Sequence, residues 1–178
     1  MSALTVGTAT VSTSLVAGTN TYPNNQGNAN DVLTTNGSGT LTWAAPAGGG
    51  GGKETIVNSS SAISGTINLD FESAQIYHYT ANAGGNWTVN FRGSSSVTLN
   101  NSMDTNQSLT FVLYSQQGST AYYNNGWQID GSGKTPKWLG GFGTPNSGHT
   151  NSVDVYTYTI MKVGNNDFRI YANQNFYT

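Results

Sequence analysis

Of the 178 residues, 8% are charged, against about 25% in an ordinary soluble domain, so ion pairs cannot be what organises the fold. The aromatic share of 11% and the net charge of -2 argue against a disordered chain, and abundant glycine, asparagine, serine and threonine favour an ordered, loop-rich β protein. Because the six lysine and arginine residues are scattered singly, cysteine is absent and no apolar run approaches 18 residues, we expect no nucleic-acid binding, no disulfide and no membrane insertion.

Residues 1–46 are predicted to form short strands. Apolar residues alternate there with small polar ones, which is the period of a strand with one buried face. The predicted strands are Leu4–Thr8, Val11–Leu15, Val32–Thr35 and Thr40–Trp43. Asn20–Asn30 is expected to be a loop, whereas Asn36-Gly37 tolerates positive φ and predicts a hairpin turn between the last two strands.

This N-terminal segment has too few large apolar side chains to close a core, and an isolated hairpin is marginal in water. We therefore expect several copies to intertwine around a common axis as a short β shaft, in an obligate homotrimer. A glycine-rich connector, residues 47–52, follows and marks the boundary to a second domain. Glycines 48–52 would suit positions close to a symmetry axis, where no side chain fits.

From residue 53 to residue 178 strand-like segments recur between glycine and asparagine turns. They are Ile67–Phe71, Ile76–Tyr79, Trp87–Phe91, Leu109–Leu113, Val153–Ile160 and Phe168–Tyr171. No stretch shows apolar residues at helical spacing with caps. Many short strands of this kind predict an all-β head, an antiparallel β-sandwich of jelly-roll type.

Motifs that would support catalysis or cofactor binding are weak. Gly131-Ser132-Gly133-Lys134-Thr135 resembles the end of a phosphate-binding loop, but the first glycine of that pattern falls on Gln128, and we read Asp130-Gly131 as a β-turn. A threefold assembly could gather copies of His78 or His149 on an axial metal, but a solvated or hydrogen-bonded histidine is commoner. We therefore predict no cofactor and no metal site.

The eight carboxylates are spread singly, without the spacing of a calcium loop or a metalloprotease. Two of them could still meet in space, as a glycan-cleaving spike would require. A head of about 125 residues is small for such an enzyme, so we expect a protein without catalytic residues.

Aromatic residues set among glycine and asparagine are the remaining distinctive feature. Rings in such loops can bind sugars, because a ring buries much area at a small entropic cost while amides read hydroxyl groups. The candidate receptor-contact or interface residues are Tyr122, Tyr123, Trp127, Trp138 and Phe142. For the two tryptophans we favour packing in the head or between subunits, with receptor contact as the alternative.

Two groups of motifs resemble proteins of bacteriophage particles. Tyr22-Pro23, a glycine-containing spacer and Val32-Leu33-Thr34-Thr35 before Asn36-Gly37-Ser38-Gly39 and Trp43 resemble a recurrent shaft or adaptor segment of phage structural proteins. The second group resembles the head module of marine and cyanobacterial phage virion proteins of the tail-fibre-like kind. Its motifs are Trp87–Gly93, Thr120–Tyr123, Gln128–Gly131, Pro136–Trp138 and Asp154–Ile160.

The resemblance implies a virion structural protein that forms trimers and has no catalytic residues. Our leading hypothesis is a short trimeric tail-fibre-like appendage that docks on another virion protein through its N-terminal segment, with a head that is expected to contact the host surface, where a glycan is the candidate partner. A shaft of about 45 residues cannot reach far at about 3.3 Å per residue, so a capsid decoration or capsid fibre protein is the alternative. A glycan hydrolase spike is a poorer third reading.

Overall fold

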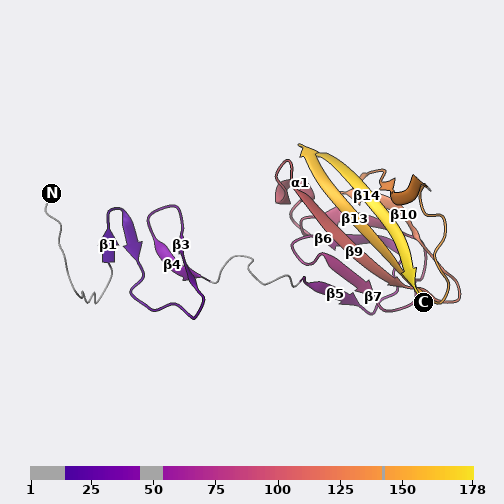
Figure 1. Ribbon diagram of the computed structural model, residues 1–178, viewed down its shortest axis with the longest axis horizontal. Coiled ribbons are helices and arrows are strands. Elements are labelled where there is room, and N and C mark those ends of the chain that lie inside the picture. The colour runs from indigo at the N-terminus through magenta and orange to yellow at the C-terminus, as the bar shows by residue number, and fades with distance from the viewer. Residues whose placement is uncertain (1–14, 45–53, 142) are drawn as a thin grey trace. The chain divides into compact units, whose positions relative to one another are not determined.

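The computed structural model describes residues 15–44, 54–141 and 143–178, and in this part of the chain strands dominate. The predicted all-β class is confirmed. The chain divides into two compact units, Met1–Gly52 and Lys53–Thr178 (Figure 1). The strands predicted at residues 4–8 and 11–14, the glycines 48–52 and Phe142 lie outside the described residues.

The N-terminal unit contains two small antiparallel hairpins. β1 (Leu15–Ala17) pairs with β2 (Asn20–Tyr22), and β3 (Val32–Thr35) pairs with β4 (Leu41–Ala44). The β3–β4 hairpin is confirmed, because Asn36 Oδ1 accepts from the backbone N–H groups of Ser38 (2.8 Å) and Thr40 (3.2 Å). Residues 20–22, expected to be loop, instead form β2.

The loop that follows Tyr22-Pro23 packs against the side chain of Trp43. The indole Nε1 of Trp43 donates to the carbonyl of Asn25 (2.9 Å), and the ring lies against Gly27. A Cβ on Gly27 would approach Trp43 Cγ to 2.7 Å, so only glycine fits beneath the ring. The loop therefore folds back over its own tryptophan.

The N-terminal unit has no core of its own within its described residues. None of the side chains of residues 15–44 is buried, and Leu15, Val16 and Val32 leave 50%, 59% and 43% of their surface exposed. Burial of apolar surface is the main force that stabilises a fold, so these hairpins lack it as a single chain.

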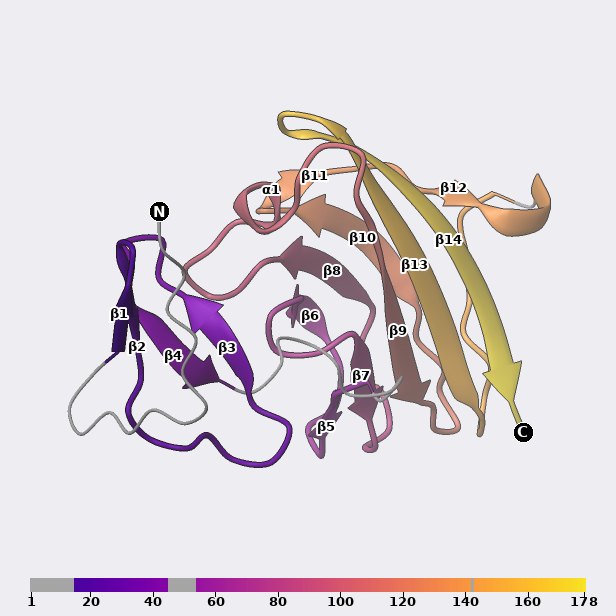
Figure 2. The same ribbon diagram turned by 60° about the vertical axis from the view of Figure 1, so that its left-hand side comes forward.

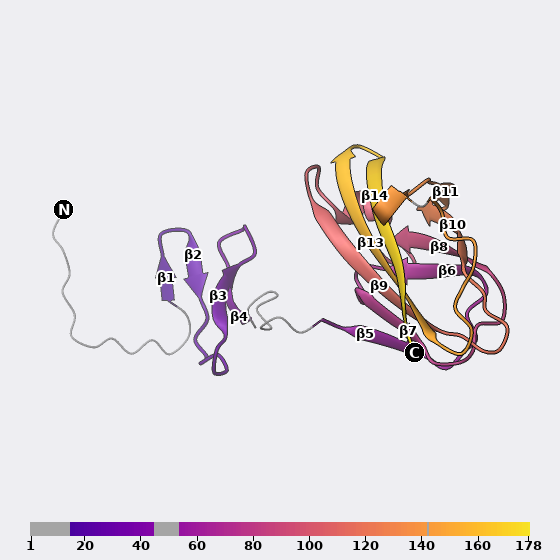
Figure 3. The same ribbon diagram turned by 45° about the vertical axis from the view of Figure 1, so that its right-hand side comes forward.

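Two sheets form the second unit, which we call the head (Figures 1 and 3). The six-stranded sheet has the order β12-β14-β13-β9-β7-β5, and the four-stranded sheet has the order β11-β10-β8-β6. The strands are β5 (Ile56–Ser59), β6 (Gly65–Asp70), β7 (Ile76–Tyr79), β8 (Trp87–Arg92), β9 (Ser108–Gln116), β10 (Asn124–Ile129), β11 (Ser132–Gly133), β12 (Lys137–Trp138), β13 (Val153–Gly164) and β14 (Asp167–Tyr177).

The expected antiparallel, jelly-roll-like pairing is wrong for the first half of the head. From β5 to β10 successive strands alternate between the two sheets, so β5, β7 and β9 are parallel neighbours in one sheet and β6, β8 and β10 in the other. Each connection crosses to the facing sheet, and the next strand of the same sheet therefore runs in the same direction. In the described part of the head, antiparallel pairing is limited to β9–β13, β13–β14 and β10–β11 (Figure 2).

The predicted Asp130-Gly131 turn joins β10 to β11, with φ of 51° and 78° at its two residues. Asp130 also supports a feature that the sequence did not predict, the single-turn helix α1 (Leu99–Ser102). Its carboxylate accepts from the backbone N–H of Leu99 (2.7 Å) and of Asn100 (3.2 Å). The buried ammonium of Lys162 donates to the carbonyls at the other end of this turn, those of Asn100 (2.5 Å) and Met103 (2.6 Å).

One aromatic-rich core lies between the two sheets. The Phe91 ring of β8 lies 5.3 Å from the ring of Phe111 and 5.1 Å from that of Tyr158, both in the facing sheet. Trp87 meets Tyr156 edge to face at 5.5 Å. Such contacts add stabilisation beyond the apolar area that they bury.

Replacing Phe91 with alanine should destabilise the head by about 3–5 kcal/mol, because the cavity would face both sheets. Urea unfolding of the full chain, followed by tryptophan fluorescence at one fixed protein concentration, measures this change. Val163→Ala, on a side chain that is 44% exposed, is the matched control and should stay within about 0.5 kcal/mol. Equal effects of the two substitutions would contradict the assignment of Phe91 to the core.

Candidate functional site

A pocket of about 450 Å³ lies where β12 ends beside β14. β12 pairs with β14 only at Tyr171 and Ala172 before the chain turns into the 3-10 segment Leu139–Gly141 (Figure 2). Beyond Ala172, this edge of β14 has no neighbouring strand among the described residues. The pocket is lined by Trp138, Leu139, Gly140, Gly143, Thr144, Pro145, Asn146, Asn173 and Gln174.

The aromatic wall of the pocket is the half-buried indole of Trp138. It meets the ring of Trp127 at 5.6 Å and that of Tyr158 at 6.5 Å, both edge to face, so its orientation is fixed by the core. A ring held in this way offers a flat apolar surface without losing rotamer freedom when a ligand binds.

Three side-chain amides line the pocket. Gln174 is held in place, because its Nε2 donates to the carbonyl of Ser147 (3.1 Å) and to the hydroxyl of Tyr156 (3.0 Å). The side chains of Asn146 and Asn173 line the pocket and make no hydrogen bond with any described residue. Aspartate, glutamate, lysine and arginine are absent from the described lining.

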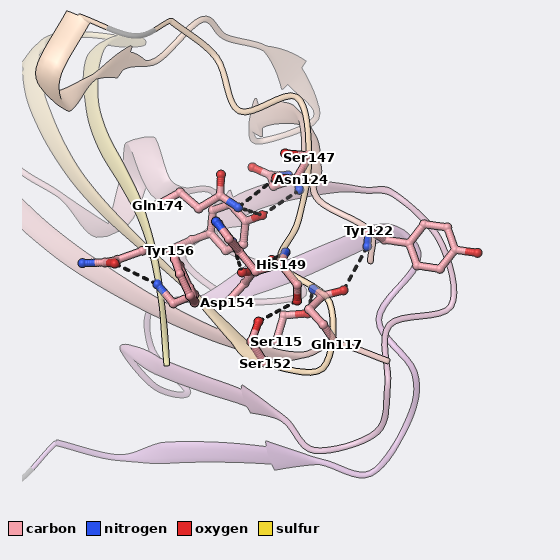
Figure 4. Close-up of polar contacts among 12 residues, drawn as sticks. Ser115, Gln117, Tyr122, Asn124, Ser147, His149, Ser152, Asp154, Tyr156 and Gln174 are labelled. Atoms are coloured by element: carbon pink, nitrogen blue, oxygen red, sulfur yellow. Dashed lines mark hydrogen bonds and ion pairs between the residues drawn. The ribbon is translucent and has the colours of Figure 1, made fainter. Parts of the chain in front are cut away.

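The loop that forms the outer wall is attached to the sheet through His149. Its Nδ1 lies 2.7 Å from Asp154 Oδ1, its backbone N–H donates to Asp154 Oδ2 (3.3 Å), and its ring stacks on Phe176 at 3.9 Å. The hydroxyl of Ser152 donates to the His149 carbonyl (2.6 Å). Figure 4 shows His149, Asp154, Tyr156 and Gln174 gathered in one cluster.

Asp154 is fully buried, and this burial raises the pKa of its carboxyl above the ordinary value of 3.8. The hydrogen bonds from His149 oppose the shift. Burial likewise raises the pKa of the Tyr156 and Tyr158 hydroxyls, so both stay protonated. The Tyr158 hydroxyl donates to Asn124 Oδ1 (2.9 Å), which extends the network into the core.

A second branch of the buried network runs along the loop before β10. Gln117 Oε1 accepts from the backbone N–H of Tyr122 (2.9 Å), and its Nε2 donates to the Ser115 hydroxyl (3.2 Å). The Tyr122 ring itself points away from the cluster (Figure 4). This branch therefore holds the backbone at Tyr122 in place, and the Tyr122 ring does not line the pocket.

The structure brings only some of the predicted site residues together. Trp127 and Trp138 are neighbours, and both pack against the core, as does part of Tyr122. Of the five predicted aromatics, the described pocket lining includes only Trp138, while Tyr122 and Tyr123 lie in the connection before β10. Sequence reasoning missed Asn146, Asn173 and Gln174, since asparagine is too common in this chain to signal a site.

Comparison with protein-family models, curated proteins and solved structures found no match. Within the described ranges, no group of three or more histidine, cysteine, aspartate or glutamate side chains is arranged to hold a metal ion. The same residues contain no helix long and apolar enough to cross a bilayer.

Several carboxylates have structural partners. Asp70 forms a two-point ion pair with Arg92 (2.7 and 2.9 Å), Asp130 accepts from the first turn of α1, and Asp167 pairs with Arg169. Asp154 is bound to His149. The chemistry that the pocket offers is thus binding through a ring and neutral amides.

Replacing Asp154 with asparagine should flatten part of the pH dependence of stability. Because the folded pKa is raised, the unfolded chain releases this proton first, so wild type loses stability as the pH rises from 3.8 through the folded pKa. Urea unfolding of both proteins between about pH 3 and about pH 6 should show the wild type falling relative to the variant. Asp104→Asn, at an exposed carboxylate, is the control. A difference that is constant across this range would contradict the raised pKa.

Proposed function

We propose that this chain is a non-enzymatic structural protein of a bacteriophage particle, a short homotrimeric fibre or tail-fibre-like appendage. Its N-terminal unit attaches to another virion protein, and its β head projects and contacts the host surface. One observation carries this proposal: residues 15–44 are folded into hairpins but bury no side chain. The resemblance of its two groups of motifs to phage virion proteins supports the same conclusion.

The physical reason is the apolar surface left open on the hairpins. Leu33 and Trp43 expose 38% and 41% of their surface, in addition to Leu15, Val16 and Val32. Transfer of such side chains from water contributes about 25 cal/mol per Å² of apolar surface. Copies intertwined around one axis supply the missing core, and three such copies make a closed cyclic assembly.

The head offers a second surface suited to contact between copies. The outer face of the six-stranded sheet carries a groove of about 400 Å³ lined by Ile56, Ile76, His78, Tyr114, Val153 and Tyr177. Ile56 and Tyr177 are 51% and 65% exposed, and none of these side chains is aspartate, glutamate, lysine or arginine. An uncharged apolar face of this kind is complementary to another copy of itself.

The alternative is a capsid decoration or capsid fibre protein. The shortness of the N-terminal strands, three or four residues each, favours it, because such a segment holds the head close to its anchoring surface. Electron microscopy of particles labelled with antibodies against the head separates the two: label at the tail supports the appendage and label over the shell supports the decoration. Particles without label would refute both.

Charging the exposed side of the hairpins should dissociate the assembly. Val32→Asp removes no contact within a buried core of the single chain, yet it places a carboxylate where a neighbouring copy would pack. In sedimentation velocity at equal concentrations we expect wild type to migrate as a trimer and this variant as a smaller species.

Ser38→Asp is the matched control for this experiment, because Ser38 is exposed in the turn of the same hairpin. It adds the same charge and should leave the trimer intact. A wild-type protein that stays a folded monomer at every concentration would overturn the trimeric fibre.

A further inference from the structure

We propose that the pocket beside Trp138 binds a neutral hexopyranose unit of a cell-surface glycan. This inference rests on the proposed function, since it assigns the host contact of the head to one site. The wall of the pocket combines one fixed indole with the free amides of Asn146 and Asn173, and its volume of about 450 Å³ falls within the range of small-molecule sites.

The indole matches the apolar side of a sugar ring. A pyranose has one face made of C–H groups, which stacks on an aromatic ring and buries area at little entropic cost. Trp138 is already held by Trp127 and Tyr158, so binding does not have to order it. Gly140 and Gly143 line the same pocket and carry no side chain of their own.

The amides match the hydroxyl groups of the same ring. Each carboxamide carries a donor group and an acceptor, as neighbouring hydroxyls of a sugar do. Asn146 comes from the loop and Asn173 from the edge of β14, so the two approach the pocket from different elements. Gln174, fixed by Tyr156 and Ser147, sets the position of the strand relative to the loop.

The lining also predicts the charge of the ligand. A sialic acid, a uronate or a phosphate is bound most strongly through charge-assisted hydrogen bonds from a cation, and the described lining offers none. Lys137 and Lys134, the nearest lysines in sequence, line a different hollow together with Arg169. A neutral sugar is therefore favoured over an acidic one.

The other described hollows of the head lack a ring beside amides without described partners. The hollow beside Phe71 contains one amide, that of Gln107, but its oxygen accepts from the backbone N–H of Asp104 and its nitrogen donates to the Asp104 carboxylate. The groove on the outer sheet face has rings but no amide, and the hollow around Arg92 and Asp130 has serines but no aromatic side chain. Single sugar sites are weak, and three on one assembly would raise the overall affinity without tighter contacts. Binding is therefore best measured with the full-length assembled chain.

The test uses the full-length protein on an immobilised panel of oligosaccharides containing glucose, galactose or mannose, beside sialylated and uronate-containing ones. We expect saturable binding to at least one neutral oligosaccharide. Asn173→Ala and Asn146→Ala should each weaken that binding by about tenfold, the effect of losing one or two hydrogen bonds. Trp138→Phe keeps an aromatic ring against the core. It should weaken sugar binding less than a double variant that carries both Asn146→Ala and Asn173→Ala.

Asn175→Ala is the matched control, because Asn175 lies on the same strand, is exposed and does not line the pocket. Its binding should equal that of wild type. No neutral sugar bound, binding to acidic glycans only, or binding unchanged in both asparagine variants would each overturn the proposal. Sedimentation velocity and antibody labelling of the particle test the proposed function separately from sugar binding. If no neutral sugar binds, the proposed function still stands. If a sugar binds but no label is found on the particle, only the proposed function is refuted.

Discussion

The contact of Phe91 with Phe111 and Tyr158 ties the two sheets of the head together, and it reflects a shortage that shapes the whole chain. Hydrophobic residues make up only 35% of the sequence, and the head gathers its largest ones in a single core. The hairpins at residues 15–44 have no such core. Within the described residues the hairpins thus lack the apolar burial that stabilises the head, and the proposed assembly would supply it from neighbouring copies.

Buried polar side chains make the head rigid through the hydrogen bonds that they form with one another and with the backbone. Asn124, Gln117, Asp154 and Lys162 are buried, and each has hydrogen-bond partners. A buried polar group without a partner is costly, whereas a satisfied network has one preferred geometry. The network reaches the pocket through Gln174 and the loop through His149, so the buried Asp154 and Tyr156 help to hold the lining of the pocket in place.

Local patterns in the sequence were sufficient for most strands and for both glycine turns. Alternation identified β6, β8, β9, β13 and β14, and Asn36-Gly37 and Asp130-Gly131 turn as expected. The sequence did not predict which of the two sheets each strand joins. The same turn residues occur in a hairpin, which stays in one sheet, and in a connection that crosses to the facing sheet. The pocket was equally hidden, since Asn146 and Asn173 meet only after β12 has ended beside β14.

Several of the charged side chains of the head bind other parts of its own chain. Arg92 holds Asp70 across neighbouring strands, Asp130 caps the turn at α1, and Lys162 closes that turn from the other side. The groove on the outer sheet face and the described lining of the pocket contain only uncharged or histidine side chains. Charge at either place would oppose apolar contact between copies or demand a charged ligand. The same scarcity of charge thus accounts for a face suited to self-association and for a pocket suited to a neutral sugar.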